Sequence, residues 1–323
     1  MPTSKPTPRA AIVGIAGTEL TAEEAALFRR HRPVGAILFR RNVDNPGQLA
    51  ALTAALREEL GAEAPILVDQ EGGRVARLRA PHWTEFPPPA RFENGPEAAA
   101  EANAALLGAE CAAVGLDVVC APCLDLRLPG QHAVIGDRAF SADPGEVARL
   151  GAAWVRGLQA AGCIPVIKHI PGHGRALVDS HESLPRVEAS AAELAADIAP
   201  FRALADSGAW AMTAHILYAA WDAARPATLS PRIVGEVIRG EIGFDGVLVS
   251  DDLAMGAMQG LSNDLAGAAI GAGCDVVLHC TGVLEETAAI LADCPVLPEA
   301  AARRLAASRE AVRRALRPAA AVA

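Results

Sequence analysis

Eight short apolar runs, each followed by a longer stretch rich in alanine and leucine, constrain the fold of this chain more than any other feature. The runs cover residues 11–15, 35–39, 65–69, 116–121, 164–167, 209–213, 246–250 and 275–278. The helical stretches include residues 21–30, 46–60 and 298–316. Short apolar runs that alternate with helices are typical of parallel strands, and eight such units in one chain predict an α/β fold of the (β/α)8, or TIM, barrel class.

An open doubly wound sheet is the alternative arrangement of the same elements. No G-x-G-x-x-G sequence follows the first run, and no phosphate-binding P-loop sequence is present. The 323 residues suit a barrel, which typically has about 250 residues plus insertions, and no linker divides them. We therefore predict a single domain over residues 1–323, in which the polar, proline-rich residues 1–9 form a flexible N-terminal tail.

Composition excludes several classes of protein. The formal net charge of −9 and the lack of a basic run argue against nucleic-acid binding. No apolar run is long enough to span a membrane, and the N-terminus lacks the apolar core of a signal peptide. Seven cysteines, mostly within apolar runs, fit reduced thiols. Cys120 and Cys123 form one C-x-x-C, for which zinc or redox use stays an alternative. We expect a cytoplasmic protein that acts as a monomer.

Ionisable side chains follow the predicted strands at the point where each strand ends. They are Asp69, Lys168, His169, His215, Asp251 and His279. In a barrel the carboxyl ends of the strands surround one pocket. A single polar residue in such a place often caps the next helix, but six of them over several strands predict an active site.

The densest group of ionisable residues lies between 168 and 182, where glycines and a proline predict a loop. Within it, Asp179 precedes His181 by two positions. A carboxylate beside an imidazole fixes its tautomer and favours its protonated form, as general acid–base catalysis requires. The alternative is a loop histidine whose neighbouring aspartate is only solvated.

A metal site is an alternative use of His169, His173 and His181. However, Pro171 and Gly172 exclude the helical spacing that metal-binding H-E-x-x-H motifs use. The cationic Lys168 also adjoins the group. We expect neither a metal nor an organic cofactor.

Three further motifs carry charged residues. Residues 69–77 read Asp-Gln-Glu-Gly-Gly-Arg-Val-Ala-Arg, which indicates either a ligand-binding loop or a solvated turn. Asp137 and Arg138 lie between apolar flanks, where the arginine either binds a ligand or pairs with its neighbour. Asp251 and Asp252 end the seventh run, and each could be a catalytic carboxylate or a helix cap.

Together these motifs resemble glycoside hydrolase family 3, and specifically its bacterial single-domain β-N-acetylglucosaminidases of the NagZ type. The resemblance covers almost the whole chain. It rests on residues 69–75, Gly136-Asp137-Arg138, the run from Lys168 to Pro185, Thr213-Ala214-His215 and Ser250-Asp251-Asp252-Leu253. This chain departs from the family pattern at Ile170, where the family has phenylalanine, and at residues 175–178, where the family has a more polar spacer.

The resemblance implies a role for each matching residue. Asp251 matches the catalytic nucleophile, His181 the acid/base and Asp179 its partner. The positions that match sugar-binding residues are Asp69, Arg77, Arg138, Lys168 and His169. The implied activity is retaining, exo-acting hydrolysis of terminal β-linked N-acetylglucosamine (GlcNAc). The implied substrate is a small carbohydrate, a muropeptide fragment of GlcNAc and anhydro-muramic acid from peptidoglycan recycling.

Two other functions remain open at this point. A phosphorylase would resolve the same glycosyl-enzyme with phosphate instead of water. A non-catalytic sugar-binding barrel would keep the pocket but not the chemistry, although Asp251, Asp179 and His181 together speak against it.

Overall fold

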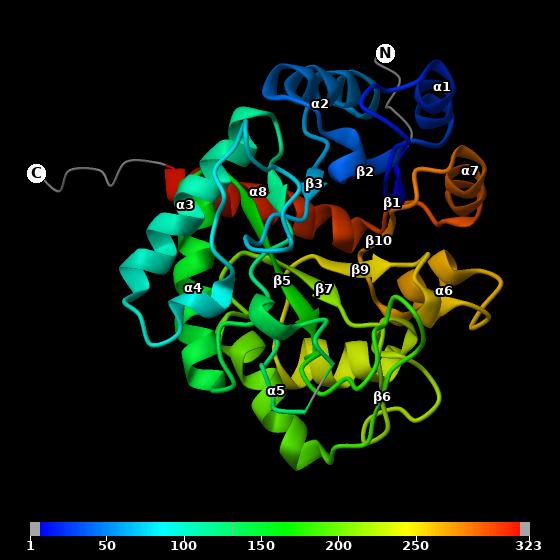
Figure 1. Ribbon diagram of the computed structural model, residues 1–323. Coiled ribbons are helices and arrows are strands. Elements are labelled where there is room, and N and C mark those ends of the chain that lie inside the picture. Colours follow the sequence, from blue (N-terminus) through cyan, green and yellow to red (C-terminus); the bar gives the residue numbers. More distant parts are fainter. Residues whose placement is uncertain (1–6, 131, 317–323) are drawn as a thin grey trace, which may run out of the picture.

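In the computed structural model, which describes residues 7–130 and 132–316, parallel strands form a closed barrel (Figure 1). Around the barrel the order is β1-β10-β9-β7-β5-β4-β3-β2. Pairing of β1 with β10, in which Ala11 lies opposite Val277, closes the sheet. The strands are β1 Arg9–Val13, β2 Pro33–Leu38, β3 Ile66–Val68, β4 Val118–Val119, β5 Ile164–Ile170, β7 Trp210–Thr213, β9 Leu248–Asp252 and β10 Val276–His279. The predicted barrel is confirmed.

Helices connect successive strands and surround the barrel (Figure 1). They are α1 Ala22–His31, α2 Pro46–Leu60, α3 Glu97–Ala113, α4 Pro144–Ala160, α5 Ala191–Ala203, the π-helix η5 Ile233–Glu241, α6 Leu265–Ala272, α7 Leu284–Asp293 and α8 Glu299–Leu316. At the start of α1, Thr21 and Glu24 bond reciprocally to each other's backbone N–H. Within the described ranges, no helix has both the length and the apolarity to cross a bilayer.

Small side chains let the helices pack closely, as the alanine-rich composition suggests. The contact between α3 and α4 shows why. A side chain at Gly157 would place its Cβ 2.3 Å from the carbonyl oxygen of Glu101. At Gly108 it would meet the Ala161 side chain at 2.8 Å. Two helices can approach this closely only where a side chain is missing.

Three strands extend further at their carboxyl ends than the apolar runs predict. β5 includes Lys168 and His169, which we placed on the following loop, β9 includes Asp251, and β10 includes His279. The prediction ended each strand at the first charged residue, whereas the barrel provides partners for charges at its carboxyl end. At the N-terminus Arg9 opens β1 and donates its backbone N–H to Arg32, so the predicted tail does not include it. Residues 1–6 lie outside the described residues.

A two-stranded parallel sheet outside the barrel was not predicted. It pairs β6 Arg186–Val187 with β8 Leu217–Tyr218. Strands of two residues are too short to show any periodicity in the sequence. The sheet joins the loops that follow β5 and β7, and it therefore supports the end of the barrel where the predicted site lies.

Candidate active site

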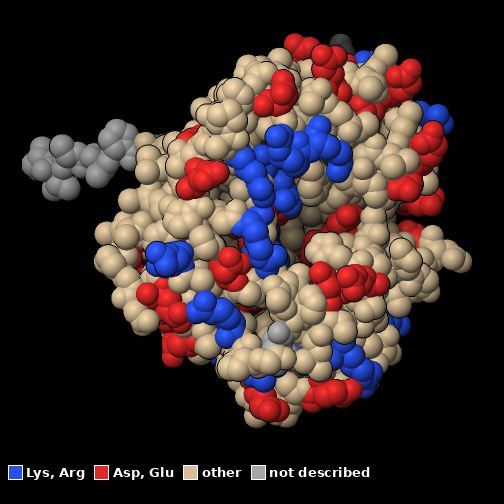
Figure 2. All heavy atoms as spheres, in the orientation of Figure 1, with Lys and Arg blue, Asp and Glu red and all other residues tan. Residues whose placement is uncertain are grey.

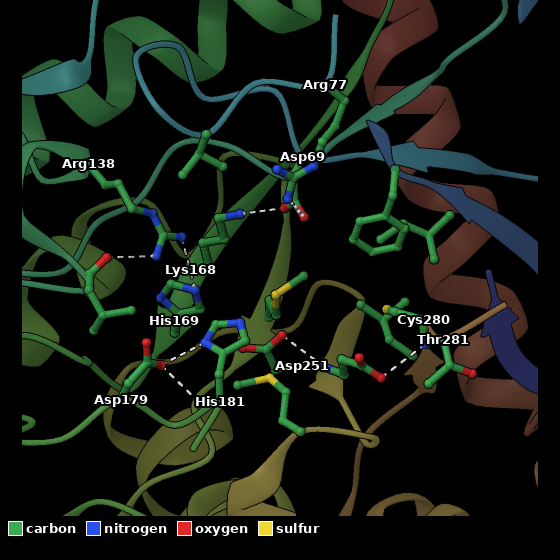
Figure 3. Close-up of a pocket in the computed structure, with 18 of the residues that line it drawn as sticks. Asp69, Arg77, Arg138, Lys168, His169, Asp179, His181, Asp251, Cys280 and Thr281 are labelled. Carbon is green, nitrogen blue, oxygen red and sulfur yellow. Dashed lines mark hydrogen bonds and ion pairs between the residues drawn. The ribbon is translucent and has the colours of Figure 1, made fainter. Parts of the chain in front are cut away.

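A cavity of about 520 Å³ opens at the carboxyl ends of the barrel strands. Figure 2 shows this face with a central hollow, bordered by a band of basic side chains and by acidic groups. The eight residues that match catalytic or sugar-binding positions line the cavity, and Figure 3 shows them directed towards its interior. They are Asp69, Arg77, Arg138, Lys168, His169, Asp179, His181 and Asp251.

Four charged side chains form a network on one wall. The Lys168 ammonium lies 2.8 Å from Asp69 Oδ1 and 2.7 Å from Glu71 Oε1. Arg138 donates two hydrogen bonds of 2.8 Å to the Glu71 carboxylate. Arg138 therefore does not pair with its neighbour in sequence, because Asp137 instead accepts from Arg74 at 3.0 Å. Buried charges persist only when they are paired in this way.

The network keeps its acids ionised. Burial alone would raise the pKa of both carboxyls, but the neighbouring Lys168, Arg77 and Arg138 hold the pKa of Asp69 well below its ordinary range. In the same way Arg138 and Lys168 lower the pKa of Glu71 to about 2. A carboxyl with so low a pKa cannot hold a proton at neutral pH, so Glu71 is unsuited to act as a general acid.

We predict that Lys168→Met lowers the free energy of unfolding by about 3 kcal/mol. Lys168 is only 2% exposed and neutralises two buried carboxylates, so its removal leaves an excess of buried negative charge. The loss lies at the low end of the 3–5 kcal/mol range for broken buried pairs, because Arg77 and Arg138 still pair with the two acids. Urea unfolding measures the change.

The matched control breaks the exposed pair between Arg74 and Asp137, whose side chains are 48% and 45% exposed. Asp137→Ala should cost less than about 1 kcal/mol. Equal effects of Lys168→Met and Asp137→Ala would contradict the structural role of the Lys168 network.

Asp125 holds His169 in place and was missed by the sequence analysis. It is fully buried and accepts from His169 Nδ1 at 2.6 Å, and from the backbone N–H groups of His169 and His173 at 3.1 and 2.6 Å. These bonds fix the His169 ring, with Nδ1 as the donor, so that Nε2 is left for the cavity. The sequence did offer a sign of it, because Asp125 is an acidic residue shortly after the fourth apolar run, and Asp69 was identified by its place at the end of the third.

The loop after β3 turns sharply at two glycines. Both have positive φ, 90° at Gly72 and 56° at Gly73, and a Cβ at Gly72 would lie 2.4 Å from the Pro87 carbonyl oxygen. The turn brings Arg77 back over the strand end, where its guanidinium contacts Asp69 Oδ2 at 3.1 Å. The solvated-turn alternative is therefore wrong for Arg77, which lines the cavity.

Asp251 and Asp252 have different surroundings. Oδ1 of Asp251 accepts the backbone N–H of Asp252 at 2.8 Å. Burial would raise the pKa of Asp251, but the nearby His169 and His215 lower it below the ordinary range. The pKa of Asp252 is raised, mainly by burial, and its Oδ1 accepts the backbone N–H groups of Ala254 and Cys280, both at 3.0 Å. Asp251 is thus a carboxylate at the cavity, and Asp252 holds the backbone of two loops.

Asp179 and His181 form the predicted pair. Nδ1 of His181 lies 2.7 Å from Asp179 Oδ1, and the same oxygen accepts the His181 backbone N–H at 2.9 Å. Burial would raise the pKa of Asp179, but these bonds to His181 lower it. The carboxylate therefore keeps a proton on Nδ1 and leaves Nε2 to exchange protons with a bound molecule. In Figure 3 the His181 ring is drawn between Asp179 and Asp251.

Two predicted histidines do not line the cavity. His215 is fully buried, and its Nε2 donates to the Asp252 carbonyl oxygen at 3.0 Å while Nδ1 meets the Thr228 hydroxyl at 2.7 Å. His279 is also buried, and its Nε2 lies 3.1 Å from the Thr281 hydroxyl. The pKa of each is lowered, mainly by burial. Both histidines support the loops around the site.

Among the described residues, one group of side chains has the spacing of metal ligands. Its members are Cys123, Asp125 and His169, whose ligand atoms lie within 4.8 Å of one another. Burial raises the pKa of the Cys123 thiol well above its ordinary value, and Asp125 already binds His169. A metal ion there would have to displace that hydrogen bond and deprotonate a buried thiol.

The chain is similar to known proteins over most of its length. Residues 12–315 match the model of the glycosyl hydrolase family 3 N-terminal domain. A β-hexosaminidase of Alkalilimnicola ehrlichii is 44% identical over 283 residues, which is 83% of this chain and 80% of that protein. A β-hexosaminidase of Pseudomonas aeruginosa is 41% identical over 275 residues, 83% and 81% of the two chains.

Solved structures share the whole architecture. NagZ of Neisseria gonorrhoeae superposes with a TM-score of 0.84 at 35% identity, over 97% of this chain and 94% of that one. A family 3 β-N-acetylglucosaminidase of a Paenibacillus species gives a TM-score of 0.85 at 34% identity, over 97% of this chain and 63% of the larger protein.

Proposed function

The chain belongs to glycosyl hydrolase family 3, and from this premise we propose that it is a retaining exo-β-N-acetylglucosaminidase. The observation that carries the proposal is that Asp251, at the end of β9, and the pair of Asp179 and His181, on the loop after β5, line one cavity. A carboxylate held ionised and an imidazole held in one tautomer are the nucleophile and the proton carrier that retaining hydrolysis requires.

In the first step, an Asp251 carboxylate oxygen attacks the anomeric carbon, and the bond to the leaving oxygen breaks. His181 gives its Nε2 proton to that oxygen, so the aglycone departs as a neutral alcohol. The products of this step are a glycosyl-enzyme ester on Asp251 and a neutral imidazole. Asp179 stabilises the imidazolium before transfer and holds the ring in place.

In the second step, the neutral His181 takes a proton from water as the water oxygen attacks the anomeric carbon. The ester bond breaks, which restores the Asp251 carboxylate and releases the sugar with its original configuration. A histidine in this role avoids a second anion beside the nucleophile.

The network of charged residues around Lys168 suits the hydroxyl groups of a sugar ring. Asp69 is an acceptor held between Lys168 and Arg77. Beside it Arg138 offers donors, one of which lies 3.5 Å from Nε2 of His169, the acceptor nitrogen of that ring. Charged hydrogen-bonding groups that are fixed in advance discriminate strongly between sugars with and without matching hydroxyls. We assign these five residues to the binding of the terminal sugar.

The proposed substrate is GlcNAc linked to anhydro-muramic acid, with or without a stem peptide, in peptidoglycan recycling. Its support is the likeness to NagZ of Neisseria gonorrhoeae, a structure of which contains N-trifluoroacetyl-D-glucosamine. The muropeptide aglycone, the cytoplasmic location and the monomeric state stay predictions.

We predict release of nitrophenol from an aryl β-GlcNAc and at least tenfold slower release from the aryl β-glucoside. The glucoside lacks the acetamido group, so the enzyme groups that bind it would be left unpaired and the glucoside would bind more weakly. A sugar-binding barrel without catalysis would release none. Analysis of the sugar product in phosphate buffer separates the remaining alternatives. Free GlcNAc supports a hydrolase, whereas GlcNAc 1-phosphate would show that the enzyme is a phosphorylase.

A further inference from the structure

The loop that contains His181 is hydrogen-bonded to the loop that follows Asp251 along the chain. We call residues 171–183 the acid/base loop and residues 253–264 the β9 loop. The backbone N–H of Gly256 donates to the carbonyl oxygen of His181 at 3.2 Å. The N–H of Ala257 donates to the carbonyl oxygen of Ser180 at 3.1 Å. Two adjacent donors of the β9 loop thus hold two adjacent carbonyls of the acid/base loop.

This contact matters because little else holds His181 in place. Its side chain is 63% exposed and is bound by Asp179, which belongs to the same loop. Leu177 and Val178 in the middle of the acid/base loop are 64% and 40% exposed, so apolar packing fixes the loop weakly. Other attachments of the loop lie before His181. Arg175 pairs with Asp197, and the Tyr218 hydroxyl donates to the Gly172 carbonyl oxygen. The backbone N–H of His173 donates to Asp125, and that of His132 donates to the Ala176 carbonyl oxygen.

Gly256 allows the contact because it lacks a side chain. A Cβ there would lie 2.7 Å from the carbonyl oxygens of both His181 and Glu182. The φ of Gly256 is outside the left-handed region, so its backbone could accept alanine without strain. An alanine would therefore act by pushing the acid/base loop away from the β9 loop.

We propose that Gly256 and Ala257 are positioning residues that set the place of His181 relative to Asp251. They follow the nucleophile by five and six positions, so one short segment carries Asp251 and also fixes the acid/base. The inference rests on the proposed function, since it requires His181 to be the acid/base. It assigns no chemistry to Gly256 itself. Displacement of a catalytic group by about 1 Å can cost about 10²-fold in rate.

The test is Gly256→Ala, with Gly271→Ala as the matched control. Gly271 lies in α6, the helix that follows the β9 loop, and a Cβ there meets no atom within 4 Å. We expect Gly256→Ala to slow hydrolysis of a GlcNAc disaccharide by about 10²-fold. The glycosylation rate with a dinitrophenyl β-GlcNAc should change less than about threefold, because that leaving group needs no proton. Gly271→Ala should match the wild type.

A double variant gives a further test of the proposal. In a His181→Ala background, Gly256→Ala should add no further loss on the disaccharide, because both changes remove the same function. An equal loss on both substrates, no loss on either, or an additive loss in the double variant would overturn the proposal.

Amide hydrogen exchange in the wild-type protein gives a measurement that needs neither a variant nor activity. The N–H groups of Gly256 and Ala257 should exchange slowly, because both are bonded to the acid/base loop. Fast exchange at both positions would show that the loops are not attached and would overturn the proposal. Inactivity of the wild type on every GlcNAc substrate would instead refute the proposed function. The exchange rates would still show whether the acid/base loop is attached to the β9 loop.

Discussion

Asp251→Ala is expected to lower turnover of a GlcNAc disaccharide and of an aryl β-GlcNAc by about 10⁴-fold or more, as loss of an enzyme's covalent nucleophile does. The loss should be similar for both substrates, because each requires the glycosyl-enzyme whatever its leaving group. The fold should be unaffected, since the hydrogen bond that the Asp251 side chain accepts from the backbone of Asp252 is local. Steady-state kinetics and thermal unfolding measure the two effects.

Asp252→Asn serves as the control for Asp251. Asparagine keeps the Oδ1 acceptor that binds the N–H groups of Ala254 and Cys280, so the two loops should stay joined. We expect a loss of activity far smaller than that of Asp251→Ala. Full activity in Asp251→Ala, or an equal loss in both variants, would refute the assignment of the nucleophile.

His181→Ala should lose activity in a way that depends on the leaving group. Protonation matters most for the basic alcohol of a natural disaccharide, and general acid–base help is worth about 10²–10⁴-fold. The loss on the disaccharide should fall in that range. The rate at which a dinitrophenyl β-GlcNAc glycosylates the enzyme should be nearly unchanged, because the activated phenolate departs without a proton. Pre-steady-state release of dinitrophenol measures that step.

Azide provides an independent check on His181→Ala. It should partly restore turnover of the activated substrate, because it attacks the glycosyl-enzyme without needing a general base. Asp179→Ala should show a weaker form of the same defect, since the imidazole remains but loses the carboxylate that orients it. Equal losses on both substrates without rescue would mean that His181 only shapes the site. The exposed Glu182 would then be the leading acid, because Glu71 is buried in ion pairs.

The sequence predicts the barrel and most of the cavity for a physical reason. Alternating strands and helices bring all strand ends to one rim, so Asp69, Lys168 and Asp251 could be grouped without any knowledge of contacts. The pair of Asp179 and His181 was accessible because its members are two residues apart. The cap that Thr21 forms at the start of α1 rests on the same kind of local pattern, since its partner Glu24 lies three residues away.

Contacts between distant segments could not be predicted. Whether Arg138 pairs with Asp137 or with Glu71 depends on how the loops after β3 and β4 meet, and the structure selects Glu71. Asp125 holds His169 through a contact between residues that are 44 positions apart in the sequence. The carboxyl ends of β5, at Ile170, and of β9, at Asp252, were predicted too early for the same reason, since only the barrel shows that charges there are paired or line a cavity.

Trapping of the glycosyl-enzyme tests the account most directly. A fluorinated GlcNAc analogue with an activated leaving group should form a slowly hydrolysed ester, which adds the mass of one sugar to the intact protein. Peptide mapping by mass spectrometry should place that sugar on Asp251. A label on Asp252, or turnover of the analogue without any covalent adduct, would contradict the assignment of Asp251 as the nucleophile of a retaining glycosidase.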